Sequence, residues 1–171
     1  MEEALDYFPE LEDVHIDIRI KNDIEGSFMQ AQPIFRSMLG GRKKRKYKIK
    51  ISRYLIIERN VKDVAYIPHD VLVGWIGHEM GHLIDYLPRT NLNLIWFGIR
   101  YVFSKKFMAE AERRADIFAI ERGFSSFLIK SKNYILEQTS LPEKYREKIR
   151  KYYLSPEEVM MYLEGELDPV S

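Results

Sequence analysis

The sequence predicts an α+β fold in which a small N-terminal sheet precedes a series of helices. Apolar residues alternate with polar ones in two segments before Pro68, a pattern typical of strands, whereas after Pro68 they recur at helical spacing. The chain has 171 residues, of which 46% are hydrophobic and 31% charged. This length and composition are typical of a single globular domain.

The composition restricts the classes of function. A net charge of +1 predicts no strong overall attraction to nucleic acid or to anionic membranes. The chain has no cysteine, so any metal ion must be bound by His, Asp or Glu. The acidic first residues lack the basic and apolar regions of a signal peptide, and with the absence of cysteine this predicts a cytoplasmic protein.

Two strands are predicted from alternation, His15 to Ile20 and Tyr47 to Ile57. In the first strand, the three isoleucines are expected to form a buried face. The segment between them, Phe28 to Met38, fits either a strand or a short helix. The basic run Arg42 to Lys46 follows a Gly-Gly turn, and we interpret it as a solvated hairpin tip rather than as a nucleic-acid site.

Three helices are predicted in the central part of the chain. The first contains Val71 to Tyr86. The second, Leu94 to Phe103, is the most apolar window, but about ten residues are too few to span a membrane, so we expect a buried core helix. The third covers Lys106 to Arg122 and ends at Gly123.

The last third of the chain predicts three short helices, which begin near Ser125, Pro142 and Pro156. The last two starts have serine and glutamate at the spacing of a capping box, Ser140 with Glu143 and Ser155 with Glu158. We therefore expect a first part at residues 1–123 and a helical subdomain at 124–171, packed together as one compact unit.

The sequence His78-Glu79-Met80-Gly81-His82 lies inside the first predicted helix. Residues four apart share a helix face, so His78 and His82 present two imidazoles to one point, as a zinc ion requires. Glu79 lies one position further round the helix, where it can take a proton from a metal-activated water. These five residues predict a zinc site with hydrolytic chemistry.

Glycine recurs on one stripe of the same helix, although each glycine costs about 1 kcal/mol of helix propensity relative to alanine. A close-packed neighbouring strand or an open approach to the metal would explain this stripe. The three residues are Gly74, Gly77 and Gly81.

A catalytic zinc site needs a third protein ligand, and without cysteine or a later histidine this must be a carboxylate. Asp85 and Glu110 are possible. The stronger candidates are Glu112 and Asp116, which lie four residues apart on the third predicted helix, so that one carboxylate can bind the metal while the other orients a ligating histidine.

The HExxH motif at 78–82, followed by Glu112-Arg113-Arg114-Ala115-Asp116, resembles the HExxH-plus-ExxxD pattern of gluzincin metallopeptidases. It is most similar to the small soluble minigluzincins and to the catalytic domains of the M48-type membrane peptidases. The looser match spans roughly residues 15–123. The resemblance implies a zincin-like domain with one Zn²⁺ per chain, bound by His78, His82 and Glu112. It also implies Glu79 as general base, Asp116 as the partner of a zinc histidine, and a peptide or unfolded protein as substrate.

Peptidases of this kind bind an extended substrate against an edge strand. We expect Tyr47 to Ser52 to be that strand, with Lys48, Lys50 and Ser52 at the substrate. The residue that stabilises the oxyanion is left open. The candidates are Tyr134, Tyr145, Tyr152, Tyr153 and Arg150.

Two other functions remain open. The chain could be an inert or regulatory zinc-containing binding protein, and a tail carboxylate could occupy the open zinc position in a latent form. Alternatively, it could be a nucleic-acid-associated protein that uses the basic run Arg42 to Lys46. The tail carboxylates are Glu157, Glu158, Glu164, Glu166 and Asp168.

Overall fold

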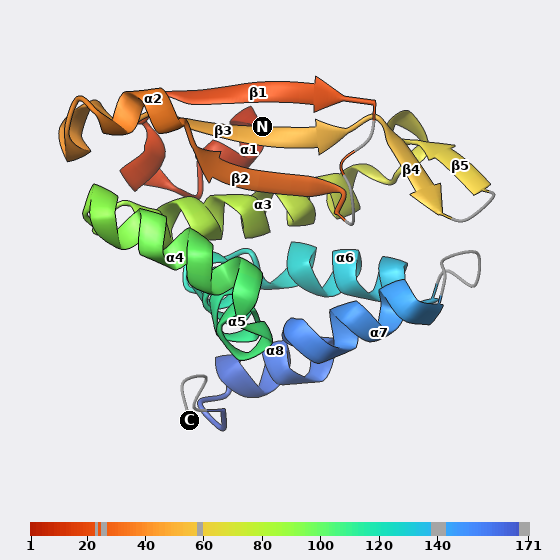
Figure 1. Cartoon of the computed structure of the whole chain (residues 1–171). Coiled ribbons are helices and arrows are strands. Elements are labelled where there is room, and N and C mark those ends of the chain that lie inside the picture. The colour runs from red at the N-terminus through yellow and green to blue at the C-terminus, as the bar shows by residue number, and fades with distance from the viewer. Residues whose placement is uncertain (23, 25–26, 58–59, 138–142, 168–171) are drawn as a thin grey trace.

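The computed structural model describes residues 1–22, 24, 27–57, 60–137 and 143–167. It confirms the mixed α+β class. Figure 1 shows a small sheet on one side of a central helix, α3, and a group of further helices on its other side. The elements in chain order are α1 (Glu2–Leu5), η1 (Pro9–Leu11), β1 (Ile16–Lys21), β2 (Met29–Pro33), α2 (Phe35–Met38), η2 (Arg42–Lys44), β3 (Tyr47–Ser52), β4 (Tyr54–Ile57), β5 (Asn60–Asp63), η3 (Val64–Tyr66), α3 (His69–Tyr86), α4 (Asn91–Phe103), α5 (Lys105–Ile120), α6 (Ser125–Glu137), α7 (Glu143–Tyr152) and α8 (Pro156–Leu163).

The main sheet has the strand order β1-β3-β2, with β3 parallel to β1 and antiparallel to β2. The strand Tyr47–Ser52, which carries Lys48, Lys50 and Ser52, is therefore central, and its prediction as an edge strand is wrong. Alternation alone does not distinguish a central strand from an edge strand. The edge strand that packs against α3 is β2.

Two further strand predictions need correction. The isoleucines of β1 do not form a buried face, since Ile18 is 42% and Ile20 69% exposed. The second strand does not continue to Ile57, because β3 ends at Ser52 and β4 pairs with β5 in a separate two-stranded sheet. The segment Phe28 to Met38 contains both predicted alternatives, the strand β2 followed by the short helix α2.

The predicted helices are present, with shifts of a few residues at their ends. The helix α5 ends before Gly123, whose φ of 84° suits glycine. The helix α8 has the predicted capping box between Ser155 and Glu158. In the other predicted box, Ser140 and the neighbouring Pro142 lie outside the described residues.

The helix α4 is not the buried core helix that its composition predicts. Leu94 and Phe97 are buried against the rest of the molecule, whereas most of its other large apolar side chains are exposed. Within the part of the chain that the structure describes, no helix combines the length and hydropathy needed to cross a membrane.

The glycine stripe of α3 allows close contact with other helices. A Cβ atom at Gly81 would overlap the backbone carbonyl of Ala115 in α5, and one at Gly74 would overlap that of Phe127 in α6. The expected explanation, a neighbouring strand or an open approach to a metal, is therefore replaced by helix–helix packing. This packing brings α5 against the face of α3 that carries the HExxH histidines.

The division into 1–123 and 124–171 remains a prediction. The described contacts nevertheless join the two parts closely, since α6 packs along α3 and α7 contacts α5. The largest hydrophobic cluster likewise includes residues from both, such as Leu83 of α3 and Leu128 of α6.

Candidate metal centre

Three potential metal ligands converge from two helices. His78 and His82 lie one turn apart on α3, and Glu112 faces them from α5. The Oε2 atom of Glu112 lies 3.0 Å from Nε2 of His78 and 3.4 Å from Nε2 of His82. Among the described residues, these three form the group of His and carboxylate side chains that could hold a metal ion.

The distances from Glu112 to the two histidines suit a tetrahedral metal. With zinc–ligand bonds of about 2.0–2.1 Å, two ligand atoms of a tetrahedron are about 3.4 Å apart, close to both separations measured here. All three side chains are buried, with 8% or less of their surface exposed. In addition, Nδ1 of His82 is buried without a described hydrogen-bond partner, so its ring is not held by hydrogen bonds on both sides.

The electrostatics of the group also call for a cation between these atoms. Burial lowers the pKa of His78, but the hydrogen bonds and charges of Asp116 and Glu112 raise it more, to about 10. Burial raises the pKa of Glu112, yet the two imidazoles hold it well below the ordinary value. The carboxylates therefore favour a positive charge at the site. A proton on His78 supplies this charge in the metal-free protein, and a metal ion can take the place of that proton.

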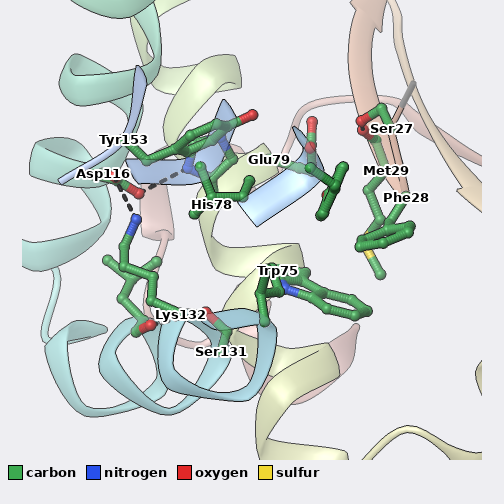
Figure 2. Close-up of a pocket in the computed structure, with 14 residues that line it drawn as sticks. Ser27, Phe28, Met29, Trp75, His78, Glu79, Asp116, Ser131, Lys132 and Tyr153 are labelled. Carbon is green, nitrogen blue, oxygen red and sulfur yellow. Dashed lines mark hydrogen bonds and ion pairs between the residues drawn. The ribbon is translucent and has the colours of Figure 1, made fainter. Parts of the chain in front are cut away.

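Asp116 orients His78 from behind. Its Oδ1 atom lies 2.9 Å from Nδ1 of His78 (Figure 2), which leaves Nε2 directed at Glu112. Its other oxygen accepts hydrogen bonds from Nζ of Lys132 at 2.7 Å and from the backbone N–H of Leu154 at 3.0 Å. Asp116 is completely buried, so these bonds fix its position.

Glu79 lies next to the three ligands, but its carboxylate is hydrogen-bonded to strand β2. Its Oε2 atom accepts a hydrogen bond of 2.5 Å from the backbone N–H of Ala31 in β2. Burial raises its pKa above the ordinary value, with a further contribution from the charge of Glu112, while the two histidines oppose this shift. A buried carboxyl with a raised pKa beside a metal group suits a residue that accepts and releases protons.

Tyrosines surround the group, and only some of them could be identified from the sequence. The hydroxyl of Tyr101 in α4 donates to Oε1 of Glu112, and the ring of Tyr86 stacks on that of His82 with 6.0 Å between centroids. Both positions lack a motif that could have indicated them. The ring of Tyr153, one of the predicted candidates, lies 5.3 Å from that of His78 (Figure 2).

A small, largely apolar pocket of about 60 Å³ opens beside His78 and Glu79. Figure 2 shows Trp75 and Phe28 on one side of this pocket and Lys132 on the other. Tyr145 and Tyr153 also line it, so residues from β2, α3 and the C-terminal helices enclose one space. The site is thus shared between the N-terminal and C-terminal parts of the chain.

Other predicted candidates lie away from the ligand group. Asp85 is buried in ion pairs with Arg89 at 2.7 Å and Arg114 at 3.5 Å, and Glu110 does not belong to the group. Glu158 is paired with Arg113 at 2.8 Å. The other described tail carboxylates lie outside the group as well, and Asp168 lies outside the described residues.

Comparison of the chain with protein-family models, with curated proteins and with solved structures yields no match.

Proposed function

We propose that this protein is a zinc-dependent metallopeptidase. The observation that carries this proposal is the convergence of Nε2 of His78, Nε2 of His82 and Oε2 of Glu112, with the carboxylate of Glu79 beside them. Two imidazoles, one carboxylate and no thiolate form a ligand set used by catalytic zinc sites, which keep a fourth position open. The resemblance to the gluzincin pattern supports the same assignment.

Each residue has a separate task in this proposal. Bound zinc would supply Lewis acidity, which acidifies water and polarises a carbonyl group. Glu79 takes the proton from the attacking water and delivers it to the departing amine, a role that its raised pKa favours. Asp116 holds His78 in the tautomer and orientation that direct Nε2 to the ligand group.

The substrate would be an extended peptide or an unfolded protein segment. The edge of β2 is the nearest strand edge, because the N–H of Ala31 points to Glu79 and away from β3. We therefore assign the substrate-binding strand to β2 in place of Tyr47–Ser52. The adjacent pocket, walled by Phe28 and Trp75, would take one apolar side chain of the substrate.

The test compares zinc-loaded wild type with Glu79→Gln on an unfolded protein substrate. Glu79→Gln keeps the shape of the side chain but removes the base, so we expect unchanged zinc content and a rate about 10²–10⁴-fold lower. Glu110→Gln is the matched control, since Glu110 lies on the same helix as Glu112 but outside the ligand group, and it should retain the wild-type rate.

The outcomes separate the proposal from its alternatives. Equal rates in wild type and Glu79→Gln would contradict the assigned base. One equivalent of zinc without any hydrolysis would favour an inert or regulatory zinc-binding protein. Less than about one equivalent, unchanged by His78→Ala, would refute the metal centre itself.

A further inference from the structure

The helix α4 exposes an apolar stripe. Six large side chains recur at spacings of three and four residues along it, so they lie on the same side of the helix. Leu92 is 80%, Trp96 60% and Phe103 84% exposed, and the stripe as a whole consists of Leu92, Ile95, Trp96, Ile99, Val102 and Phe103. Single exposed apolar residues are common, but a continuous stripe of this size indicates a surface that another body covers.

A basic loop lies beside the N-terminal end of this helix. The guanidinium of Arg42 donates to the carbonyl of Pro88 at 3.2 Å, and the amide of Asn91 donates to the carbonyl of Met38. These contacts attach the loop containing η2 to the turn between α3 and α4. Lys43 and Lys44 in this loop are exposed.

The near-neutral net charge conceals a strong separation of charge. Residues 28–57 contain nine Lys and Arg, and residues 87–108 contain four, whereas neither segment contains Asp or Glu. The remainder of the chain therefore has 14 basic and 26 acidic residues. The two basic segments are those that supply the loop and α4, so neither the loop nor α4 carries a carboxylate of its own.

We propose that α4 and the basic loop Arg42–Lys46 dock on the surface of an anionic lipid bilayer. An interfacial helix combines an apolar face that contains Trp, Phe and Leu with flanking basic residues, and α4 with its neighbouring loop has both features. Its 13 residues form a helix of about 20 Å, too short to cross a hydrocarbon core of about 30 Å. The helix therefore lies in the interface.

The combination of apolar and basic residues distinguishes a bilayer from the other possible partners of this surface. Nucleic acid would match the basic loop but would leave six apolar side chains in water. A second copy of this chain could cover the stripe, but symmetric contact would bring together the same two basic segments, which contain no Asp or Glu. An anionic bilayer accommodates both features at once.

The docking face and the metal centre lie on opposite sides of α4. The opposite side of α4 carries Tyr101, whose hydroxyl donates to Glu112. The ligand group therefore lies on the far side of α4 from the apolar stripe. If the proposed peptidase function holds, bilayer binding places its site close to peptide segments at the membrane surface, but the docking itself does not depend on that function.

The test is sedimentation of the full chain with two kinds of vesicle. One consists of phosphatidylcholine alone, and in the other about a third of the lipid is phosphatidylserine. We expect binding to the anionic vesicles that falls as salt rises, with a blue shift of tryptophan fluorescence that Trp96→Phe abolishes while Trp75 remains. Trp96→Ser with Phe103→Ser, and separately Lys43→Glu with Lys44→Glu, should each weaken binding at least about tenfold.

Matched controls are Tyr66→Ser, an exposed aromatic residue far from α4 in the sequence, and Lys144→Glu with Lys151→Glu on α7, which should bind like wild type. All of these positions are exposed, so zinc content should be unchanged in every variant.

Wild type that binds no vesicles overturns the proposal, as does binding that survives Trp96→Ser with Phe103→Ser. A dimer lost in that variant would assign the stripe to a second copy, and DNA binding without vesicle binding would assign the loop to nucleic acid. Both results count against the bilayer.

Discussion

Nζ of Lys132 lies 2.7 Å from Oδ2 of Asp116, and both side chains are almost completely buried. Lys132 comes from α6, whereas Asp116 comes from α5 and holds His78 through its other oxygen. The C-terminal helices therefore help to position a metal ligand, although the HExxH and ExxxD motifs both precede them.

Replacement of Lys132 by Met should destabilise the protein and weaken metal binding. Loss of the ammonium leaves a buried carboxylate without its main counter-charge, which costs about 3–5 kcal/mol in the free energy of unfolding. The looser Asp116 should reduce zinc affinity by about 10–100-fold. Urea unfolding and competition with a chelator measure the two effects.

Lys130→Met is the control, because Lys130 lies on the same helix but forms an exposed ion pair with Asp70. Solvent screens such an exposed pair, so stability and zinc affinity should change little. Similar effects of the two substitutions would show that the buried pair has no special role.

The stability of the metal-free protein should decrease as pH rises above neutrality. The pKa of His78 is about 10 in the folded chain, above the ordinary value of 6.5. A group with a raised folded-state pKa stabilises the fold fully below its unfolded pKa, and this contribution is lost as pH rises towards the folded pKa. Urea unfolding of EDTA-treated protein at pH 7 and pH 9 should therefore give a lower free energy at pH 9.

Two comparisons test whether His78 causes this dependence. Zinc-loaded protein should show less of it, because a ligating imidazole carries no exchangeable proton on its metal-binding nitrogen. His78→Gln without metal should also show less. If metal-free wild type is equally stable at pH 7 and pH 9, the raised pKa is refuted.

Gly81→Ala should disrupt the metal centre without changing any ligand. The added Cβ would overlap the carbonyl of Ala115 and push α5, which carries Glu112, away from α3. Overpacking of this kind costs about 1–3 kcal/mol, and zinc affinity should fall with it. Gly98→Ala on α4 is the control, because a Cβ there meets nothing within 4 Å. That substitution should stabilise the helix by up to about 1 kcal/mol and leave zinc affinity unchanged.

Spacing within single helices predicted each part of the ligand group, whereas the combination of the two parts rested on the resemblance to the gluzincin pattern. His78 and His82 share a face by their spacing, and Glu112 and Asp116 do so on the next helix. Strand order is different, since it depends on pairings between distant segments. The alternation in Tyr47–Ser52 therefore predicted a strand correctly and its place in the sheet incorrectly.

The partners of Asp116 and Glu112 were beyond sequence reasoning for a related reason. Lys132 and Tyr101 belong to no motif, and their proximity to the site arises from the way α6 and α4 pack against neighbouring helices. The burial of α4 was mispredicted because hydrophobicity was taken to mean a place in the core, whereas much of its apolar surface is exposed.

Tyr153 is the sequence candidate for an oxyanion donor that lies closest to the described chemistry, beside both His78 and Glu79. Tyr153 packs against His78 and borders the pocket beside Glu79, whereas Arg150 is engaged by Glu143 at 2.6 Å. Burial, with a contribution from Glu112, raises the pKa of Tyr153 well above its ordinary value, so the hydroxyl stays protonated and able to donate. We therefore predict that Tyr153 is the hydroxyl donor of the proposed peptidase reaction.

Tyr153→Phe removes only the hydroxyl and should lower kcat by about 10²–10³-fold, because an oxyanion donor acts mainly in the transition state. KM and zinc content should change little, since the ring still packs on His78. Tyr145→Phe is the control, because Tyr145 lines the same pocket but its ring packs on Phe28, with 4.8 Å between centroids. Equal losses of kcat in the two variants, or a loss of zinc in Tyr153→Phe, would show that Tyr153 supports the pocket and does not stabilise the oxyanion.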